Sequence, residues 1–194
     1  MEQAVILSGI GGQGIQLLSK SLALAATMAG RYAMLAADYG GEMRGGPSQA
    51  SVVTGDAPLR SLPILPSSGA AVLMHHKFSA FALERLRPDG LLLLNTSIGP
   101  AGPVGHPGRV AGFPVSAVAR DLGAPQSAGF VMLGAYVGLT GAVEPEALEQ
   151  AMRRLLPPYR AQYGDVNARA IEAGLSIAGG SPPASTARDQ VAAS

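Results

Sequence analysis

Three glycines stand at G-x-G-x-x-G spacing where an apolar run gives way to a helical pattern. The segment Gly9-Ile-Gly-Gly-Gln-Gly14 follows the apolar residues 4–7 and precedes residues 15–28, whose apolar positions recur at helical spacing. Without side chains, the backbone turns tightly and its N–H groups approach an anion, which the partial positive charge at the helix start also stabilises. The segment therefore predicts a phosphate-binding turn, whose commonest occupant is a pyrophosphate. Its candidate cofactor-binding residues are Gly9, Gly11, Gly12, Gln13 and Gly14.

Two other interpretations of this glycine segment stay open at the level of sequence. The glycines can serve only to pack a helix closely against a strand. Alternatively, the turn can belong to a nicotinamide dinucleotide site, because such a site needs an acidic residue at the end of the second strand, where Asp38 stands. Spacing alone does not exclude NAD.

A second glycine-rich segment, residues 39–48, follows the second predicted strand. Open α/β sheets bind ligands beyond the carboxyl ends of their strands, so we expect this segment to face the first one. The guanidinium of Arg44 suits a carboxylate or phosphate, and Glu42 can orient it. A solvated ion pair in a loop is the alternative. The predicted active-site or interface loop residues are Tyr39, Gly40, Glu42, Arg44, Gly45, Gly46 and Ser48.

Few other polar groups are placed for chemistry. Asn95 closes the apolar residues 91–94, and we expect it to reach the same crevice, either as a further cofactor-binding residue or as a turn cap. His75 and His76 are adjacent, so on a strand or helix they should point in different directions, and His106 is far away in the sequence. No Ser-His-Asp order and no suitably spaced carboxylate pair is present. We predict no catalytic residue and no metal site in this chain.

The composition narrows the class of protein. The chain has 194 residues, of which 47% are hydrophobic and 14% are charged, with a net charge of +1. No basic cluster indicates nucleic acid or anionic lipid, and no apolar run reaches the length of a membrane span, so we expect a cytoplasmic protein. The low charge favours coverage by partner chains, although a GC-rich genome also produces it. With no cysteine, this chain alone cannot hold an iron–sulfur cluster by thiolates.

Apolar runs and glycine or proline breaks predict alternating strands and helices. Strands 4–7 and 32–37 should be parallel neighbours joined by helix 15–28, with residues 49–54 as a half-exposed strand of an edge hairpin. The remaining predicted elements are strands 70–74, 91–94 and 109–113 and helices 78–86, 115–122, 127–140, 144–155 and 165–178. The expected fold is α/β: a three-layer, Rossmann-like, doubly wound and mostly parallel sheet with additional C-terminal helices. Residues 1–180 should form a single domain, and residues 181–194 a C-terminal tail rich in Pro, Ser and Ala.

The two glycine-rich segments, in this order, resemble the signature of the gamma subunit or gamma domain of 2-oxoacid:ferredoxin oxidoreductases, which act on pyruvate, ketoisovalerate or 2-oxoglutarate. The match is Gly9-Ile-Gly-Gly-Gln-Gly14 followed about 25 residues later by Tyr39-Gly-Gly-Glu-Met-Arg-Gly-Gly-Pro-Ser48. The similarity continues through Pro88-Asp-Gly-Leu-Leu-Leu-Leu-Asn95-Thr-Ser97 and Leu133-Gly-Ala135, and it covers roughly residues 1–178. Two motifs in order are more specific than either alone.

The resemblance implies a subunit of a complex that oxidatively decarboxylates a 2-oxoacid with coenzyme A and passes electrons to ferredoxin. It implies that thiamine diphosphate, magnesium and the iron–sulfur clusters belong to partner subunits: alpha and beta, with a ferredoxin-like delta subunit as a further candidate. The glycine loops could then receive the phosphates of coenzyme A or close the substrate cavity. The alternatives are a free-standing NAD- or flavin-dependent oxidoreductase and a non-catalytic nucleotide-binding assembly module.

Overall fold

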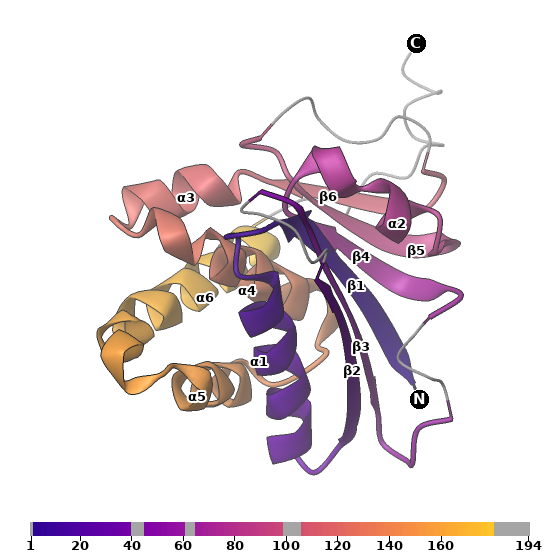
Figure 1. Ribbon diagram of the computed structural model, residues 1–194, viewed down its shortest axis with the longest axis horizontal. Coiled ribbons are helices and arrows are strands. Elements are labelled where there is room, and N and C mark those ends of the chain that lie inside the picture. The colour runs from indigo at the N-terminus through magenta and orange to yellow at the C-terminus, as the bar shows by residue number, and fades with distance from the viewer. Residues whose placement is uncertain (1, 40–44, 61–64, 99–105, 181–194) are drawn as a thin grey trace.

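The computed structural model describes residues 2–39, 45–60, 65–98 and 106–180, with residues 38 and 39 described by their backbone only (Figure 1). Four predicted features lie outside this description. They are Gly40, Glu42 and Arg44 of the second glycine-rich segment, the side chains of Asp38 and Tyr39, the middle of the loop before residue 106, and the C-terminal tail 181–194.

A six-stranded mixed sheet forms the centre of the molecule, with strand order β2-β3-β1-β4-β5-β6. Strands β1, β4, β5 and β6 are parallel neighbours, whereas β3 lies antiparallel between β1 and β2. The bounds are Gln3–Ile10 for β1, Tyr32–Tyr39 for β2, Pro47–Gly55 for β3, Ser68–Leu73 for β4, Leu86–Asn95 for β5 and Arg109–Phe113 for β6. The predicted α/β class is confirmed.

The position of β3 corrects two predictions from the sequence. Strands β1 and β2 are not neighbours, because β3 folds back from β2 as the second arm of a hairpin and occupies the place between them. The edge strand of the hairpin is β2, and β3 is buried rather than half-exposed, with Ser51 at 5% and Thr54 at 3% of their full exposure. Polar alternation misled the prediction because these short hydroxyl side chains lie inside the sheet.

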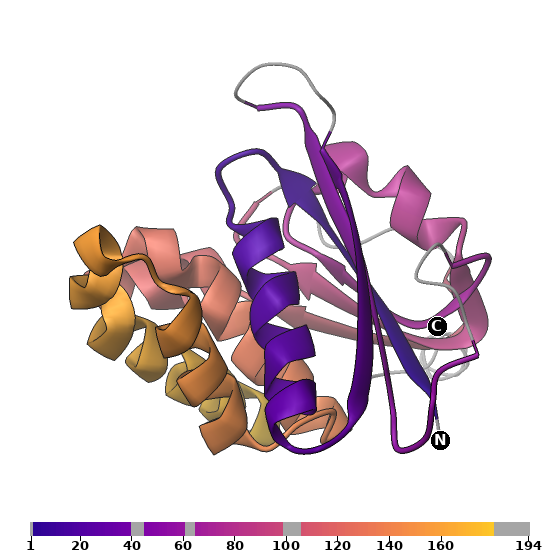
Figure 2. The same cartoon turned by 60° about the horizontal axis from the view of Figure 1, so that its bottom comes forward.

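The helices are distributed unequally over the two faces of the sheet. Figures 1 and 2 show α1, α3, α4, α5 and α6 on one face and the short α2 on the other. The bounds are Ile15–Met28 for α1, Ala80–Leu83 for α2, Val115–Asp121 for α3, Ala128–Thr140 for α4, Pro145–Leu155 for α5 and Gly164–Gly179 for α6. Three 3-10 turns add η1 at His76–Phe78, η2 at Pro125–Ser127 and η3 at Pro158–Tyr163. The large core therefore lies under α1 and α4, and a smaller one lies under α2.

Among the predicted helices, the helix over residues 78–86 differs most in length from the structure. It becomes the turn η1 and the four-residue α2, because β5 already begins at Leu86, which pairs with Ser68 of β4. The β4-α2-β5 unit is nevertheless the parallel unit that the sequence predicts. Among the described residues, no helix has the length and apolarity needed to cross a membrane.

Helix α4 is apolar on all sides, and its residues 128–137 are all buried. It packs directly on α6, and backbone atoms of the two helices approach closely at Gly134 and Gly174. A Cβ on Gly174 of α6 would collide with the carbonyl oxygen of Val131, and a Cβ on Gly134 of α4 would collide with that of Ile171. Glycine at both positions therefore lets the helices approach, and the contact fixes α6 beside the start of α1 and η3.

Candidate functional site

The first glycine segment lies where the sequence places it, between the carboxyl end of β1 and the start of α1. Gly12 and Gly14 have φ angles of +103° and +76°, in the left-handed region that favours glycine. Gly9 has a different constraint, because a Cβ there would lie 2.6 Å from Oε1 of Gln13 and 3.1 Å from Cβ of Met74. The loop is thus both conformationally and sterically restricted to glycine.

The start of α1 is open to an anion. Gly14 is the N-cap residue, it provides no side-chain cap, and the first turn of the helix contains no acidic residue. The N–H groups of a first helical turn lack partners within the helix and carry the positive end of its dipole. These N–H groups would donate hydrogen bonds to a phosphate or carboxylate oxygen.

Two amide side chains meet at one backbone carbonyl on the same edge of the sheet. Nε2 of Gln13 and Nδ2 of Asn95 both donate to the carbonyl oxygen of Met74, each at 3.3 Å. Oε1 of Gln13 also accepts from the N–H of Ile10 at 2.9 Å, and Nδ2 of Asn95 also donates to the hydroxyl of Ser116 at 2.9 Å. These bonds tie the ends of β1, β4 and β5 to α3, so both amides are already used to hold the backbone.

The second glycine segment closes on the first. The N–H of Gly11 donates to the carbonyl oxygen of Gly46 at 2.8 Å, and Ser48 pairs with Gly9 in the β1–β3 ladder. The predicted juxtaposition of the two segments is therefore present for the part that the structure describes, residues 45–48. A ligand on the first loop would lie next to the second.

A cavity of about 350 Å³ opens on the other side of the first loop, toward α6. Gly12, Gln13 and Gly14 line it together with Arg160 and Tyr163 of η3. Within the described part of the chain, Arg160 has no ion pair, and its guanidinium lies 5.6 Å from the ring centre of Tyr159. It adds a positive charge opposite the positive end of α1, so the cavity favours an anion.

Arg160 is a candidate site residue that no sequence motif indicates. Its sequence signal is the turn Pro157-Pro-Tyr-Arg-Ala-Gln-Tyr163, in which an arginine is flanked by two tyrosines that stay exposed. Arginine and tyrosine are the residue types most often found at binding hot spots. Only the fold brings this turn to the glycine loop, because about 145 residues separate them in the chain.

The two adjacent histidines differ from the sequence expectation, because their rings stack with centroids 4.6 Å apart. His75 is the N-cap of the 3-10 turn η1, and His76 is its first residue. Nδ1 of His75 accepts from the N–H of Lys77 at 3.1 Å. Burial and the neighbouring His76 and Lys77 lower the pKa of His75, which favours its neutral form. In the described part of the chain, no three His, Asp or Glu side chains are grouped to hold a metal ion.

The role of Asn95 can be separated from ligand binding by a stability measurement. We expect Asn95→Ala to lower the free energy of unfolding by about 2 kcal/mol without any ligand, because it removes buried hydrogen bonds to Met74 and Ser116. Urea denaturation measures the change. Ser97→Ala is the control, since this exposed side chain only caps the N–H of Ala117 and should cost less than about 1 kcal/mol. A loss for Asn95→Ala no larger than that of the control would contradict the structural role.

Comparison with known proteins gives one consistent picture. The family model described as pyruvate ferredoxin/flavodoxin oxidoreductase matches residues 4–177. The 2-oxoglutarate synthase subunit KorC of Methanothermobacter marburgensis is 30% identical over 165 residues, which are 81% of this chain and 88% of the relative.

Solved structures agree with the sequence comparison. The gamma subunit of a keto/oxoacid ferredoxin oxidoreductase from Geobacter sulfurreducens superimposes with a TM-score of 0.76 at 29% identity, covering 93% of this chain and 98% of that one. The 2-oxoglutarate:ferredoxin oxidoreductase of Magnetococcus marinus, solved with 2-oxoglutarate, coenzyme A and succinyl-CoA bound, shares the fold at a TM-score of 0.82 and 18% identity. The match covers 94% of this chain and 32% of that longer one.

Proposed function

Because the chain belongs to the pyruvate ferredoxin/flavodoxin oxidoreductase family, we propose that it is the gamma-type subunit of a thiamine-diphosphate-dependent 2-oxoacid:acceptor oxidoreductase. The complex is an oxidoreductase that acts on the oxo group of its donor. It converts a 2-oxoacid and coenzyme A to an acyl-CoA and carbon dioxide, and two electrons pass through iron–sulfur clusters to ferredoxin. This chain contributes binding groups rather than catalytic ones.

The residues of this chain agree with cofactors held elsewhere. It contains no cysteine, so the clusters need thiolates from other subunits. We therefore assign the clusters to partner subunits, and we assign thiamine diphosphate and its magnesium to partner subunits because the chain belongs to this family.

The observation that carries the role of this chain is the junction of its two glycine loops. Gly11 of the first loop is hydrogen-bonded to Gly46 of the second, beside an uncapped helix start. The first turn of α1 beside this junction offers backbone N–H groups to a phosphate and contains no acidic residue. The structure of the Magnetococcus marinus relative was solved with coenzyme A bound. We assign the phosphates of coenzyme A as the ligand of these loops.

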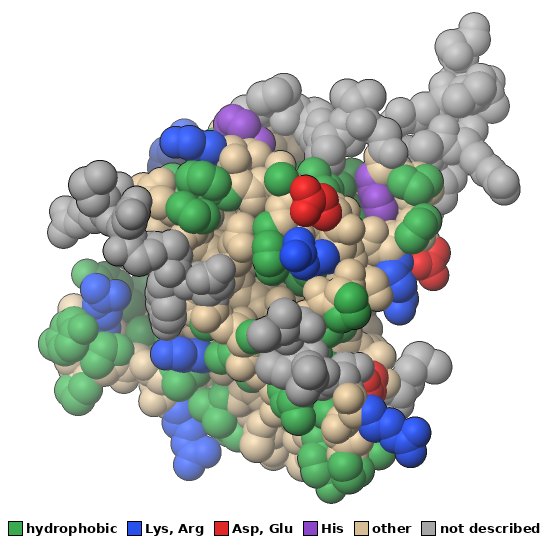
Figure 3. Space-filling view, turned by 45° about the vertical axis from the view of Figure 1, so that its right-hand side comes forward, with side chains coloured by type: hydrophobic (Ala, Val, Ile, Leu, Met, Phe, Trp, Pro, Cys, Tyr) green, Lys and Arg blue, Asp and Glu red, His purple; other side chains and the backbone are tan. Residues whose placement is uncertain are grey.

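The proposed partners are alpha and beta subunits, with a ferredoxin-like delta subunit as a further one, in a cytoplasmic complex. The face shown in Figure 3 supports partner coverage, because its charged side chains, mostly Lys and Arg, are scattered among hydrophobic and uncharged ones. Only 14% of the residues in the chain are charged, so charge repulsion does little to prevent its surface from associating with other proteins. Co-purification with thiamine-dependent subunits, followed by assays with several 2-oxoacids, tests this assembly.

Arg44 gives a direct test of the coenzyme A assignment. In the assembled complex, we expect Arg44→Ala to raise the KM for coenzyme A on the order of tenfold, because a guanidinium that binds phosphate contributes a charge-assisted hydrogen bond. Steady-state kinetics at saturating 2-oxoacid measures it. Arg120→Ala, at the exposed end of α3, should leave the value unchanged. An unchanged KM for Arg44→Ala would count against the assignment.

The alternative of a free-standing NAD or flavin oxidoreductase is tested on the isolated chain. It requires the isolated chain to bind the dinucleotide, whereas the subunit assignment predicts little affinity without partner chains. Fluorescence titration of NADH or flavin into the isolated chain separates the two. Micromolar binding would favour the free-standing enzyme.

A further inference from the structure

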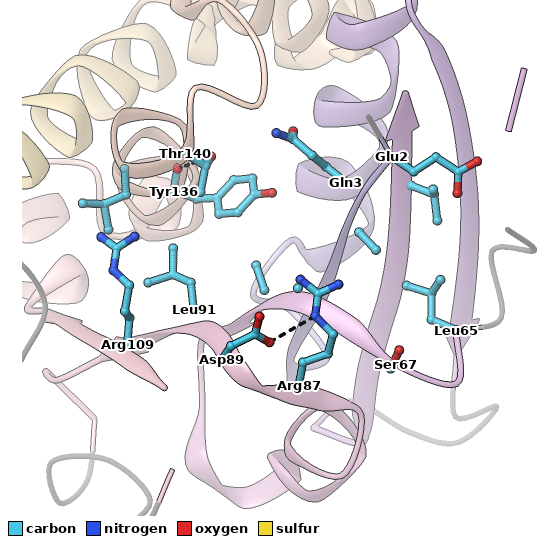
Figure 4. A pocket seen from close by; sticks show the side chains of 15 residues that line it. Glu2, Gln3, Leu65, Ser67, Arg87, Asp89, Leu91, Arg109, Tyr136 and Thr140 are labelled. Atoms are coloured by element: carbon cyan, nitrogen blue, oxygen red, sulfur yellow. Dashed lines mark hydrogen bonds and ion pairs between the residues drawn. The ribbon is translucent and has the colours of Figure 1, made fainter. Parts of the chain in front are cut away.

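A second and larger cavity, of about 590 Å³, lies at the opposite end of the sheet from the glycine loops. Figure 4 shows its lining side chains, which come from the amino-terminal ends of β1, β4, β5 and β6, the carboxyl ends of β3 and α4, and the segment before β4. Its volume is in the range of small-molecule sites, which combine apolar walls with a few polar groups. The proposed function makes no use of this cavity.

The tyrosine at the back of the cavity is a neutral hydrogen-bond donor. Only 3% of Tyr136 is exposed, and burial raises the pKa of its hydroxyl to about 12. The ring projects from α4 toward the space between Gln3 and Arg87 (Figure 4). Thr140, one turn further along the helix, donates its hydroxyl to the backbone carbonyl of Tyr136 at 2.7 Å, which holds the end of this helix in place. The cavity thus has a donor that does not ionise at physiological pH.

Two acidic and two basic side chains line the cavity, which are Glu2, Asp89, Arg87 and Arg109. Asp89 lies 3.3 Å from the guanidinium of Arg87, so these two charges offset each other. The carboxylate of Glu2 accepts from the backbone N–H of Arg60 at 2.7 Å, and in Figure 4 it is directed away from Tyr136. Arg109, at the start of β6, has no ion pair within the described part of the chain and lines the same cavity. Its guanidinium is available for an anion.

The walls are apolar and restrict the kind of anion. Leu91 of β5 lines the cavity on the side of Arg109, and Leu65 lines it on the far side (Figure 4). Leu139 of α4 adds a further apolar side chain to the lining. A fully hydrated ion would leave this surface unfilled, whereas an apolar body would bury it, at about 25 cal/mol per Å².

We propose that this cavity binds a small organic carboxylate with an apolar body. Arg109 pairs with the carboxylate, and the body lies against Leu91 and Leu139, with its far end toward the Tyr136 hydroxyl. The site is separate from the glycine loops, so its occupant need not be a reactant of the oxidoreductase. A substrate-derived acid and an unrelated metabolite share this chemistry.

Fluorine NMR on the purified complex tests the proposal with 4-fluorophenylacetate as the probe. We expect saturable line broadening with the unmodified protein and a dissociation constant that rises on the order of tenfold in Arg109→Met. Arg120→Met is the matched control, and Tyr136→Phe should give a smaller increase than Arg109→Met. The uncharged 4-fluorophenylacetamide should bind at least tenfold more weakly than the acid.

Three results would overturn the proposal. They are the absence of binding up to millimolar probe, an amide that binds as tightly as the acid, and equal affinity in Arg109→Met and the unmodified protein. Arg109→Lys keeps the positive charge and should retain most of the affinity, so it distinguishes the loss of the charge from a folding defect. Arg109 lies at the opposite end of the sheet from Gly11. Failure of the carboxylate proposal therefore does not affect the coenzyme A assignment. Unchanged coenzyme A kinetics in Arg109→Met would show that the two sites are independent.

Discussion

Gly174→Ala should lower the free energy of unfolding by about 3 kcal/mol, which is at the upper end of the usual cost of overpacking a core. The new methyl group would collide with the carbonyl oxygen of Val131 in α4. A carbonyl within a helix cannot rotate away as a side chain can, so α4 and α6 must separate. The loss is expected although alanine favours a helix over glycine by about 1 kcal/mol.

Urea denaturation of the purified chain, followed by circular dichroism, measures this effect. Gly179→Ala in the last turn of the same helix is the matched control, because a Cβ there meets nothing within 4 Å. We expect the control to lie within about 0.5 kcal/mol of the unmodified protein. Equal stability of the two variants would mean that the close approach of the helices is not needed.

The contact between α4 and α6 also affects the shape of the candidate site. Asn167 in the first turns of α6 accepts a hydrogen bond from the hydroxyl of Ser127 at 2.7 Å, and it lines the smaller cavity beside the glycine loop. A separation of α6 from α4 would therefore widen that cavity. The close-packed glycines are part of what places η3 and its arginine opposite the start of α1.

The local features of this site could be predicted from sequence because they depend on neighbours in the chain. The glycine segment at residues 9–14 follows an apolar run and precedes a helical pattern, and the structure has the same order. The order of the strands could not be predicted, since the alternation in residues 49–54 is equally compatible with an edge and with an interior strand. Burial of Ser51 and Thr54 depends on which strands lie on either side.

Long-range contacts account for what the sequence does not indicate. Gln13 is predicted as a cofactor-binding residue, and in the structure its amide is also bonded to Ile10 and Met74. The carbonyl of Met74 is 61 residues away, and no local pattern indicates that it needs a donor. Arg160 is the converse case, because a surface turn with no motif supplies the charge that faces the glycine loop.

Arg160→Glu should raise the KM for coenzyme A on the order of a hundredfold in the assembled complex. The guanidinium and the glycine loop line one cavity, so a phosphate bound at the start of α1 lies within the field of residue 160. Removing the guanidinium costs a charge-assisted hydrogen bond, about tenfold in affinity, and the introduced carboxylate adds repulsion of similar size. Arg160→Lys keeps the charge and should cost less than tenfold.

Steady-state kinetics at two salt concentrations separates this electrostatic role from a role in subunit contact. Salt screens charges at a partly exposed site, with a Debye length of about 10 Å at 0.1 M. The difference in KM between Arg160→Glu and the unmodified complex should therefore be smaller at 0.5 M salt than at 0.05 M salt. Arg154→Glu, on the exposed end of α5, controls for the change in net charge and should leave the KM unchanged. If Arg160→Glu lowers the yield of assembled complex but not its affinity for coenzyme A, the turn η3 is a subunit contact. An effect of Arg44→Ala without one of Arg160→Glu would place the phosphates on the side of the second loop instead, because Arg44 belongs to the second glycine segment and Arg160 to η3.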